Sequence, residues 1–192
     1  MTTLAQSDDD ARLVSRSLDG DAEAFRELVE RHQGRVFACA RAIMRNEAEA
    51  ADVTQDVFIR FHRHLVQFDP RRPLAPYLLR IAVNRSRDLL RERSRHDEVG
   101  ENALAAHPDT RPNPGETLMA AERAGRVRTL VAELPQSLRE VCSLFYLSEC
   151  SCAEVASILG MREGAVKVAL HRARKKLLHT LTETEVVHGE SF

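Results

Sequence analysis

Residues 151–178 carry two helix signals on either side of one glycine, and no other stretch constrains the fold as strongly. Ser151 and Glu154 have the Ser-x-x-Glu spacing in which each side chain satisfies a free backbone N–H at a helix start. Gly160 can adopt the left-handed conformation that ends a helix, and Val166 restarts an apolar stripe beyond it. This spacing predicts two helices joined by a tight turn, a helix-turn-helix.

The second helix of this stretch is predicted to be apolar on one side and basic on the other. Its basic side has an exposed β-branched residue and an imidazole among the charges, in the set Arg162, Lys167, Val168, His171, Arg172 and Lys175. Such a face suits a DNA major groove, which presents phosphates, acceptors and thymine methyls. Charge alone would favour an ordinary solvated helix face, but the turn glycine and the apolar restart favour duplex binding.

The composition points to an all-α protein. The 192 residues are 43% hydrophobic but only 5% aromatic, without tryptophan, so the cores must be mostly aliphatic. No alternating run of β-branched residues bounded by turn signals predicts a strand. We therefore expect two small helical domains joined by a flexible acidic linker, with the helix-turn-helix in the second.

Helix and loop signals divide the chain into segments. Asp21, Asn46 and Ser137 are the predicted helix caps, the last two followed by a glutamate three residues on, and Gly34 suggests a break between two helices. The segments expected are a polar lead-in over 1–19, a domain over 20–95, a linker over 96–116, a domain over 117–181 and a tail over 182–192. The linker lacks periodicity and contains three prolines and two glycines.

The charge is segregated although the net charge is only −1. Residues 60–95 contain ten arginines, and one helical stripe here carries an aromatic ring, an amide and several guanidinium groups, at Tyr77, Arg80, Asn84, Arg87 and Arg91. Beside the proline-rich basic loop 68–76, such a stripe can stack unpaired bases and neutralise phosphates. The alternative is a solvated arginine face with Tyr77 packed into the core. Arg85 falls on the apolar side, so its head group is expected to pair with a carboxylate.

The helix predicted after Asn46 has a mixed outer side. Asp52, Gln55, Asp56 and Ile59 combine acidic, polar and apolar groups there. Surfaces of this composition are used by partner proteins, although an ordinary amphipathic exterior is the simpler interpretation.

Several function classes are not expected. We find no nucleophile with a base, no phosphate loop and no paired carboxylates that would indicate an enzyme, and no cofactor site. The four cysteines are predicted to be free thiols because a reducing compartment disfavours disulfides. The Cys150-x-Cys152 spacing is wrong for a zinc knuckle, so no metal site is expected. No apolar run approaches membrane-spanning length and no leader is recognised, so a cytoplasmic location is expected.

The order of motifs resembles one family, the extracytoplasmic-function sigma factors of bacterial RNA polymerase. The segments that carry the resemblance are GDAEAFRELVERH, DVTQDVFIRFHRHL, YLLRIAVNRSRDLLR, LPQSLREVCSLFYL and SCAEVASILGMREGAVKVALHRARKKL. The resemblance implies that residues 20–95 correspond to region two, which binds the polymerase clamp and the melted minus-ten element. It implies that residues 117–181 correspond to region four, which binds the minus-thirty-five duplex and the polymerase flap.

The resemblance also assigns residues. Asp52, Gln55 and Asp56 match a clamp-binding segment, with Ile59 on the same face. The loop that holds a flipped promoter base corresponds to residues 68–76, including Phe68, Asp69, Arg71 and Arg72, and Asn84 lies beside it. Tyr77 stands where the family usually has tryptophan, and the base-reading positions correspond to Lys167, Val168, His171 and Arg172. An anti-sigma protein is an expected partner, alongside core polymerase and promoter DNA.

The prediction is therefore an alternative sigma factor. A free-standing dimeric helix-turn-helix regulator is the alternative, and it leaves the surface around Tyr77 and Asn84 unexplained. A helical interaction or metal-sensing protein using Cys142, Cys150, Cys152 and His171 is a further alternative.

Overall fold

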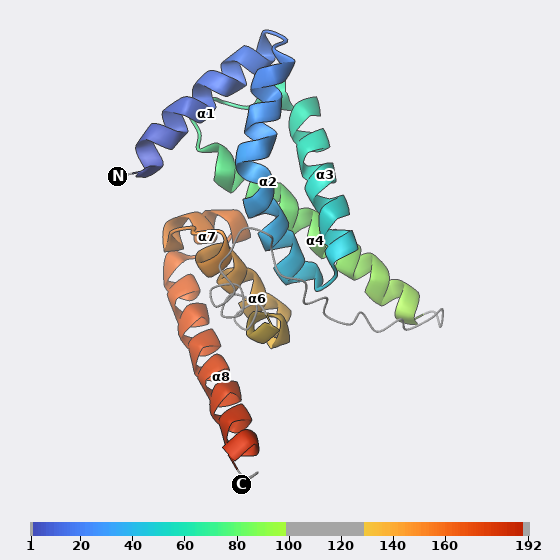
Figure 1. The fold of residues 1–192 in the computed structure, drawn as a ribbon, viewed down its shortest axis with the longest axis vertical. Helices are drawn as coiled ribbons and strands as arrows, with labels where there is room; N and C mark the ends of the chain where they lie inside the picture. The colour runs from blue at the N-terminus through green and yellow to red at the C-terminus, as the bar shows by residue number, and fades with distance from the viewer. Residues whose placement is uncertain (1, 99–128, 190–192) are drawn as a thin grey trace.

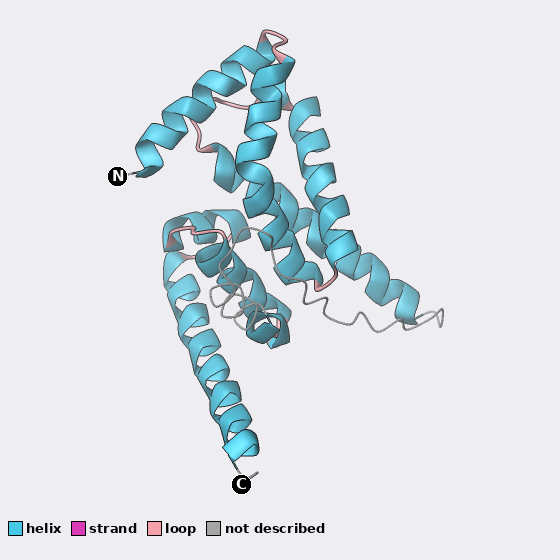
Figure 2. Cartoon of the chain, viewed as in Figure 1, coloured by secondary structure: helices cyan, strands magenta, loops and turns pink. Residues whose placement is uncertain are grey.

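The computed structural model describes residues 2–98 and 129–189, and the side chains of residues 8–96 and 129–179. Helices and short loops make up these residues, and no strand occurs among them, which confirms the all-α prediction (Figure 2). The helices are α1 (Thr2–Leu18), α2 (Ala22–Met44), α3 (Glu47–Arg63), α4 (Leu74–Glu98), α6 (Gln136–Cys142), α7 (Cys152–Leu159) and α8 (Glu163–Gly189) (Figure 1). A 3₁₀ turn, η1 (Leu65–Gln67), follows α3, and a π-helical turn, η2 (Ser143–Leu147), follows α6.

Two of the predicted caps begin helices of the first domain. The Asp21 carboxylate accepts hydrogen bonds from the backbone N–H groups of Glu23 and Ala24, at 3.0 and 3.1 Å. Arg16 binds the same carboxylate, and these hydrogen bonds lower the pKa of Asp21 below its usual range. The Asn46 amide oxygen accepts from the backbone N–H of Glu49 at 3.1 Å and begins α3. Both starts are therefore confirmed.

The helix-turn-helix forms as predicted. The Ser151 hydroxyl accepts from the Glu154 N–H at 3.2 Å, and the Glu154 carboxylate accepts from the Ser151 N–H at 2.8 Å. Gly160 ends α7 with φ of 68°, a conformation in which a side chain would be strained. Val166 then packs α8 into the core.

The N-terminal segment differs from the expected polar lead-in. Residues 2–18 form α1, and its Leu13 and Val14 are buried against α2. The signal was weak because few apolar residues mark this helix. Buried polar groups hold it as well, since Asp10 contacts both Arg31 and His32 of α2. His32 is thus a buried, hydrogen-bonded histidine.

The expected break at Gly34 does not occur, because α2 runs without interruption from Ala22 to Met44. Nothing at Gly34 requires a positive φ, which among the described glycines is found only at Gly20 and Gly160. The core of the first domain contains side chains from α1, α2, α3 and α4, and at its centre Phe61 and Leu28 are both fully buried.

The expected capping box at Ser137 and Glu140 is also absent. The helix begins at Gln136, two residues earlier than a cap at Ser137 would give, with Pro135 in the cap position and no side-chain cap. Glu140 is 3% exposed and binds Arg87 of α4 instead. The Glu140 carboxylate therefore forms an ion pair with α4, although the sequence pattern predicted that it would bind the backbone at the helix start.

The expected segment boundaries shift at two places. Helix α4 continues to Glu98, into the expected linker over 96–116. The rest of that linker and the beginning of the domain expected from residue 117 lie outside the described residues. The backbone of α8 is helical through Gly189, where a tail was expected from residue 182. Across residues 2–98 and 129–189, no helix combines the length and apolar character that crossing a membrane requires.

Candidate nucleic-acid and partner interfaces

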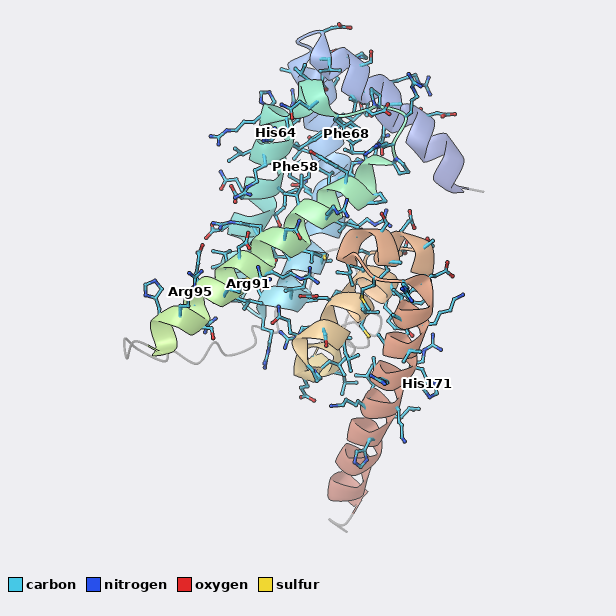
Figure 3. All side chains as sticks on the ribbon, turned by 180° about the vertical axis from the view of Figure 1, so that it is seen from behind. Phe58, His64, Phe68, Arg91, Arg95 and His171 are labelled. Atoms are coloured by element: carbon cyan, nitrogen blue, oxygen red, sulfur yellow. The ribbon has the colours of Figure 1, made fainter. Side chains whose placement is uncertain are left out.

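Helix α8 presents the predicted basic face to solvent. Val166, Leu170 and Ala173 are buried against the domain core, which fixes the rotation of the helix. The predicted reading positions are all exposed: Arg162, Lys167, Val168, His171, Arg172 and Lys175. Figure 3 shows His171 along the length of α8. The burial of one stripe thus forces the other outward, in the orientation that a recognition helix requires.

Within that face, two positions have distinct environments. Lys167 pairs with Glu163 one turn earlier, with Nζ 2.7 Å from the carboxylate, and this hydrogen bond raises the pKa of Lys167. Val168 is 50% exposed, an apolar group surrounded by charges and suited to contact with a thymine methyl.

The arginine stripe of α4 is divided into two parts. Asn84 and Arg91 are exposed, and the C-terminal part of α4 that carries Arg91 and Arg95 projects beyond α2 and α3 (Figures 1 and 3). Arg87 instead makes a two-point contact with Glu140, at 3.0 and 2.6 Å, and this hydrogen bonding raises the pKa of Arg87. Arg80 donates to the backbone oxygen of Ser157 at 2.9 Å. Two predicted strand-binding arginines are therefore engaged by the second domain.

Phe68 was expected to contact a melted strand, but its side chain packs into the core of this structure. Its side chain is 7% exposed and packs against the rings of Phe61 and Tyr77, with centroid distances of 5.6 and 4.9 Å. With few aromatic residues in the chain, these rings fill the core next to the loop. Tyr77 is half-buried at the edge of the same cluster, so it packs sideways while keeping part of its ring accessible.

The loop after Phe68 is organised by Asp69. Its carboxylate accepts from the backbone N–H of Arg71 at 3.0 Å, and its carbonyl accepts from the N–H of Arg72 at 2.9 Å. The turn projects both arginines into solvent, and the Arg71 side chain is 94% exposed. Asp69 therefore shapes the loop, and the two guanidinium groups remain available for phosphates.

The mixed face of α3 is mostly exposed. Asp52, Gln55 and Ile59 face solvent, with Ile59 41% exposed. Asp56 is half-buried and pairs with Arg85 of α4 at 2.8 Å and with Arg60 at 3.3 Å. The expectation that Arg85 would bury its stem and pair with a carboxylate is confirmed. Asp56 thus ties α3 to α4 beside the exposed face.

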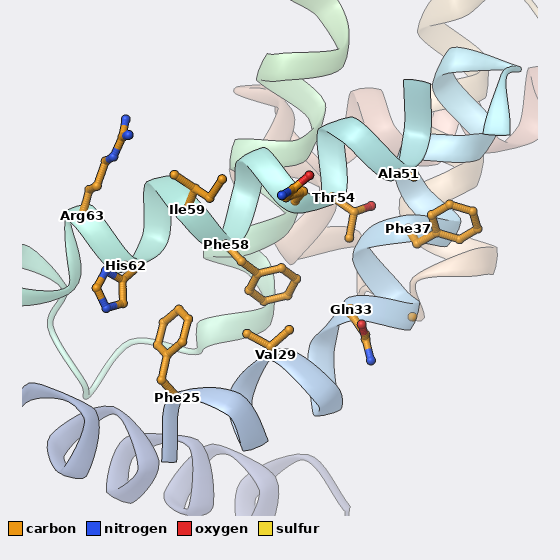
Figure 4. A pocket seen from close by; sticks show the side chains of 12 residues that line it. Phe25, Val29, Gln33, Phe37, Ala51, Thr54, Phe58, Ile59, His62 and Arg63 are labelled. Carbon is orange, nitrogen blue, oxygen red and sulfur yellow. The ribbon is translucent and has the colours of Figure 1, made fainter. Parts of the chain in front are cut away.

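An apolar groove lies next to this face and was missed from the sequence. It has a volume of about 820 Å³ between α2 and α3, and its walls include Phe25, Val29, Phe37 and Phe58 (Figure 4). Gln55 and Ile59 form part of the same lining, so the groove and the α3 face are continuous. Phe25, Val29 and Phe37 recur at helical spacing along the edge of the core stripe of α2, which was the signal available. Exposed grooves of this size and polarity are typical of binding sites.

The cysteines and carboxylates do not form a metal site in the part of the chain that the structure describes, where no group of three potential ligands lies close enough to hold an ion. Cys39, Cys142 and Cys150 are buried thiols, and Cys152 is half-buried.

Comparison with known proteins assigns both halves of the chain. The family model for sigma-70 region 2 matches residues 28–96, and the model for sigma-70 region 4 matches residues 124–177. These ranges contain the α3 face with the α4 stripe, and the helix-turn-helix, respectively.

Individual proteins agree with the family models. The chain is 33% identical over 177 residues to the RNA polymerase sigma factor CnrH of Cupriavidus metallidurans, covering 88% of this chain and 93% of CnrH. It is 31% identical over 167 residues to the probable RNA polymerase sigma factor RfaY of Xanthomonas campestris, covering 85% of this chain but only 42% of RfaY.

Solved structures show the same architecture. The structure of CnrH in complex with the cytosolic domain of CnrY matches with a TM-score of 0.68 and 30% identity, over 91% of this chain and 98% of that one. The sigma factor RpoE, in complex with the anti-sigma factor NepR from Bartonella quintana, matches in fold with a TM-score of 0.73 at 20% identity, over 84% and 98% of the two chains. The chain belongs to the extracytoplasmic-function sigma factors of bacterial RNA polymerase.

Proposed function

We propose that this sigma factor directs core polymerase to promoters through separate surfaces on its two domains. In this proposal residues 20–95 bind the polymerase clamp and the melted minus-ten element. The second domain, expected over 117–181, reads the minus-thirty-five duplex and contacts the flap. As a transcription initiation factor the chain supplies recognition, and the polymerase supplies the chemistry.

The observation that carries the proposal is the outward orientation of α8. Burial of Val166, Leu170 and Ala173 leaves Lys167, Val168 and the neighbouring basic groups exposed in one row. A row of this kind can neutralise phosphates and contact base edges in the same groove.

The strand-binding role rests on fewer residues than expected. Asn84 and Arg91 on α4, with Arg71 and Arg72 on the loop, are exposed, whereas Phe68 serves the core. We assign base contacts to Asn84 and the accessible edge of Tyr77, and phosphate contacts to the arginines. The engaged residues Arg80 and Arg87 join this surface when the second domain moves away.

The polymerase-binding role is assigned to the α3 face together with the groove. Gln55 and Ile59 belong to both, so a helical element of the clamp that contacts one also reaches the other. The RpoE structure contains an anti-sigma factor, and on that likeness we expect an anti-sigma partner for this chain as well. A cytoplasmic location accompanies this role, because the polymerase acts there.

Reconstitution tests the proposal. The purified chain is mixed with bacterial core polymerase, and co-elution and start-site-specific transcription from a promoter library are measured, with core polymerase alone as the control. The expected result is co-elution and a defined set of promoter-dependent transcripts. Absence of both would overturn the proposal.

A further inference from the structure

Two buried cysteines from different domains lie near each other. Cys39 belongs to α2, and Cys150 belongs to the short loop between η2 and α7. Both side chains pack in one apolar cluster, which contains residues of both domains. Cys39 is fully buried there and Cys150 is 2% exposed. The DNA-binding and polymerase-binding surfaces described above use neither thiol.

The contacts of Arg35 place the Cys150 thiol against α2. The Arg35 guanidinium donates to the backbone oxygen of Ser148 and, at 3.9 Å, to the Sγ atom of Cys150. The Cys150 thiol in turn donates to the same Ser148 oxygen at 3.6 Å. Arg35 and Cys39 are four residues apart on α2, so their side chains are neighbours on one face of the helix, with Cβ atoms about 5–6 Å apart. The Cys150 sulfur therefore lies on the face of α2 that carries Cys39.

The electrostatics of the two thiols agree with this placement. Burial is the main reason that the pKa of Cys39 is raised to about 12, and the neighbouring Cys150 thiol raises it as well. Burial raises the pKa of Cys150 to about 11, while the Arg35 guanidinium acts in the opposite direction. In the packed state both thiols are protonated at neutral pH and inaccessible to solutes. An oxidant can reach them when the contact between the domains opens.

We infer that Cys39 and Cys150 are a redox-sensitive thiol pair, which a hydroperoxide converts to a disulfide between α2 and the loop that precedes α7. Disulfides inside cells are usually transient and serve redox sensing, and a pair at a contact between two domains suits that use. The formation of the disulfide depends only on this chain. Its effect on transcription rests on the proposed function.

The reaction balances with the peroxide as the only other reactant. The Cys39 thiolate attacks a peroxide oxygen and the O–O bond breaks, so the sulfur is oxidised to a sulfenic acid while hydrogen peroxide is reduced to water. When the domains pack again, the Cys150 thiolate attacks the sulfenic sulfur. The S–S bond forms, the S–O bond breaks, and the leaving hydroxide takes the proton that the thiol released. Arg35 favours Cys150 as the attacking group, because its guanidinium stabilises the thiolate.

The disulfide connects the two domains covalently. Arg139 of α6 also donates to the backbone oxygen of Ile43 in the last turn of α2, at 3.0 Å, so the bond reinforces a contact that already exists. The oxidised chain cannot move its second domain away from α2. On the proposed function, oxidation therefore stops promoter use, and a dithiol that reduces the bond restores it.

Oxidation of the purified full chain tests the pair directly. The chain is treated with hydrogen peroxide, its remaining thiols are alkylated, and its unreduced peptides are analysed by mass spectrometry. The same treatment is given to a variant with Cys142→Ala and Cys152→Ser, in which Cys39 and Cys150 are the remaining cysteines. We expect a peptide that joins Cys39 to Cys150 in both proteins. Absence of this peptide, or oxidation confined to Cys142 and Cys152, would overturn the inference.

Two single variants are the matched controls. Cys39→Ala and Cys150→Ala each remove one buried thiol of the pair, and neither is expected to form an intramolecular disulfide with peroxide. Circular dichroism identifies a variant that does not fold, and the other variant then serves as the control. An intramolecular disulfide as abundant in these variants as in the wild type would show that other cysteines pair.

Transcription measures the consequence. Peroxide is removed from the oxidised chain before core polymerase is added, so that only the sigma factor is modified. Promoter-dependent transcription by the wild type is expected to fall at least about tenfold and to return with dithiothreitol, because the fraction of chains that can open is reduced. The treated Cys39→Ala variant should keep its activity.

The two parts of the inference can fail separately. A disulfide that forms without loss of transcription would overturn its regulatory role. If the reduced wild-type chain does not transcribe with core polymerase, the proposed function fails, and the cross-linked peptide alone decides whether Cys39 and Cys150 pair.

Discussion

The Nε2 atom of His32 lies 2.9 Å from the Oδ2 atom of Asp10, and both side chains are buried between α1 and α2. The other oxygen of the carboxylate accepts from Arg31 at 3.0 Å. Asp10→Ala removes the partner of the buried His32 ring and one of the two carboxylates that bind Arg31, and we expect a loss of about 1–3 kcal/mol in the free energy of unfolding, measured with urea. Asp9→Ala removes a carboxylate from an exposed pair with Arg12 and is expected to change stability by less than about 0.5 kcal/mol. Equal losses would show that α1 is not anchored by Asp10.

The capping box of α7 gives a second stability prediction. Ser151→Ala removes the acceptor for the Glu154 N–H and the reciprocal arrangement at the start of the helix-turn-helix. The expected cost is about 1 kcal/mol, measured as a shift of the urea midpoint at constant slope. Ser157→Ala lies in the middle of the same helix on an exposed position and is expected to cost nothing, since alanine is the better helix former. A Ser157→Ala loss as large as that of Ser151→Ala would contradict the cap interpretation.

The proposed role of α8 in reading duplex DNA predicts a change in the salt dependence of promoter binding. Lys167→Ala with Arg172→Ala removes two exposed positive charges, so the slope of log K against log salt for promoter binding by the holoenzyme is expected to fall by about 1.8. Promoters that depend on the upstream element are expected to lose the most activity. Arg12→Ala with Arg26→Ala makes the same charge change on exposed residues of α1 and α2 and should leave the slope unchanged. Unchanged promoter selection in the α8 variant would exclude a reading role for this face.

The proposed polymerase-binding role of the α3 face can be tested with a matched pair of exposed apolar residues. Ile59 of α3 is 41% exposed and Leu18 of α1 is 40% exposed. Ile59→Asp is expected to weaken binding to core polymerase by at least about tenfold, roughly 1.4 kcal/mol, because it places a charge in an apolar contact. Leu18→Asp should bind as the wild type does in the same fluorescence titration. If both variants bind core polymerase equally well, the interface with the polymerase does not include the groove.

Burial of thiols predicts a loss of stability at alkaline pH. Desolvation raises the pKa of Cys39 from 9.0 to about 12, so the folded state retains a proton that the unfolded state releases above pH 9. The stabilisation is present in full below pH 9 and is lost progressively as the pH rises toward 12. Between pH 9.5 and 10.5 this thiol contributes a decrease of about 1 kcal/mol per pH unit, because most of the unfolded chains have then lost the proton. Cys39→Ala should show a shallower decline in urea titrations across this range, and an identical slope would contradict the assignment.

Most local structure was predictable because its determinants are close in sequence. Asp21, Asn46 and Ser151 cap helices through backbone groups two or three residues away, and Gly160 needs only its own lack of a side chain. Glu140 could not be assigned in this way, because its partner Arg87 lies 53 residues earlier. Its spacing from Ser137 satisfies the capping pattern equally well, and only the packing of α6 on α4 decides between the two.

The candidate sites also differ in whether their determinants are close in sequence or come from distant parts of the chain. The outward row on α8 follows from helical periodicity, so the exposed residues were found from the sequence. The burial of Phe68 was not predicted because an aromatic residue at a loop can face either solvent or the core, and here its ring packs against Phe61 and Tyr77. The groove between α2 and α3 required two helices to be placed side by side, which no single stripe reveals.

The position of Asp56 affects how mutations in this region should be interpreted. Its carboxylate lies on the helix that we propose faces the polymerase, but it binds Arg85 at 2.8 Å, on the helix that carries the proposed strand-binding residues. A substitution there misaligns the DNA surface and disturbs the partner surface in one step, so a genetic screen would recover it whether or not the polymerase touches it. Loss of function at Asp56 therefore reports the contact between α3 and α4 as well as any contact with a partner, whereas loss of function at the exposed residues Gln55 and Ile59 reports contact with a partner.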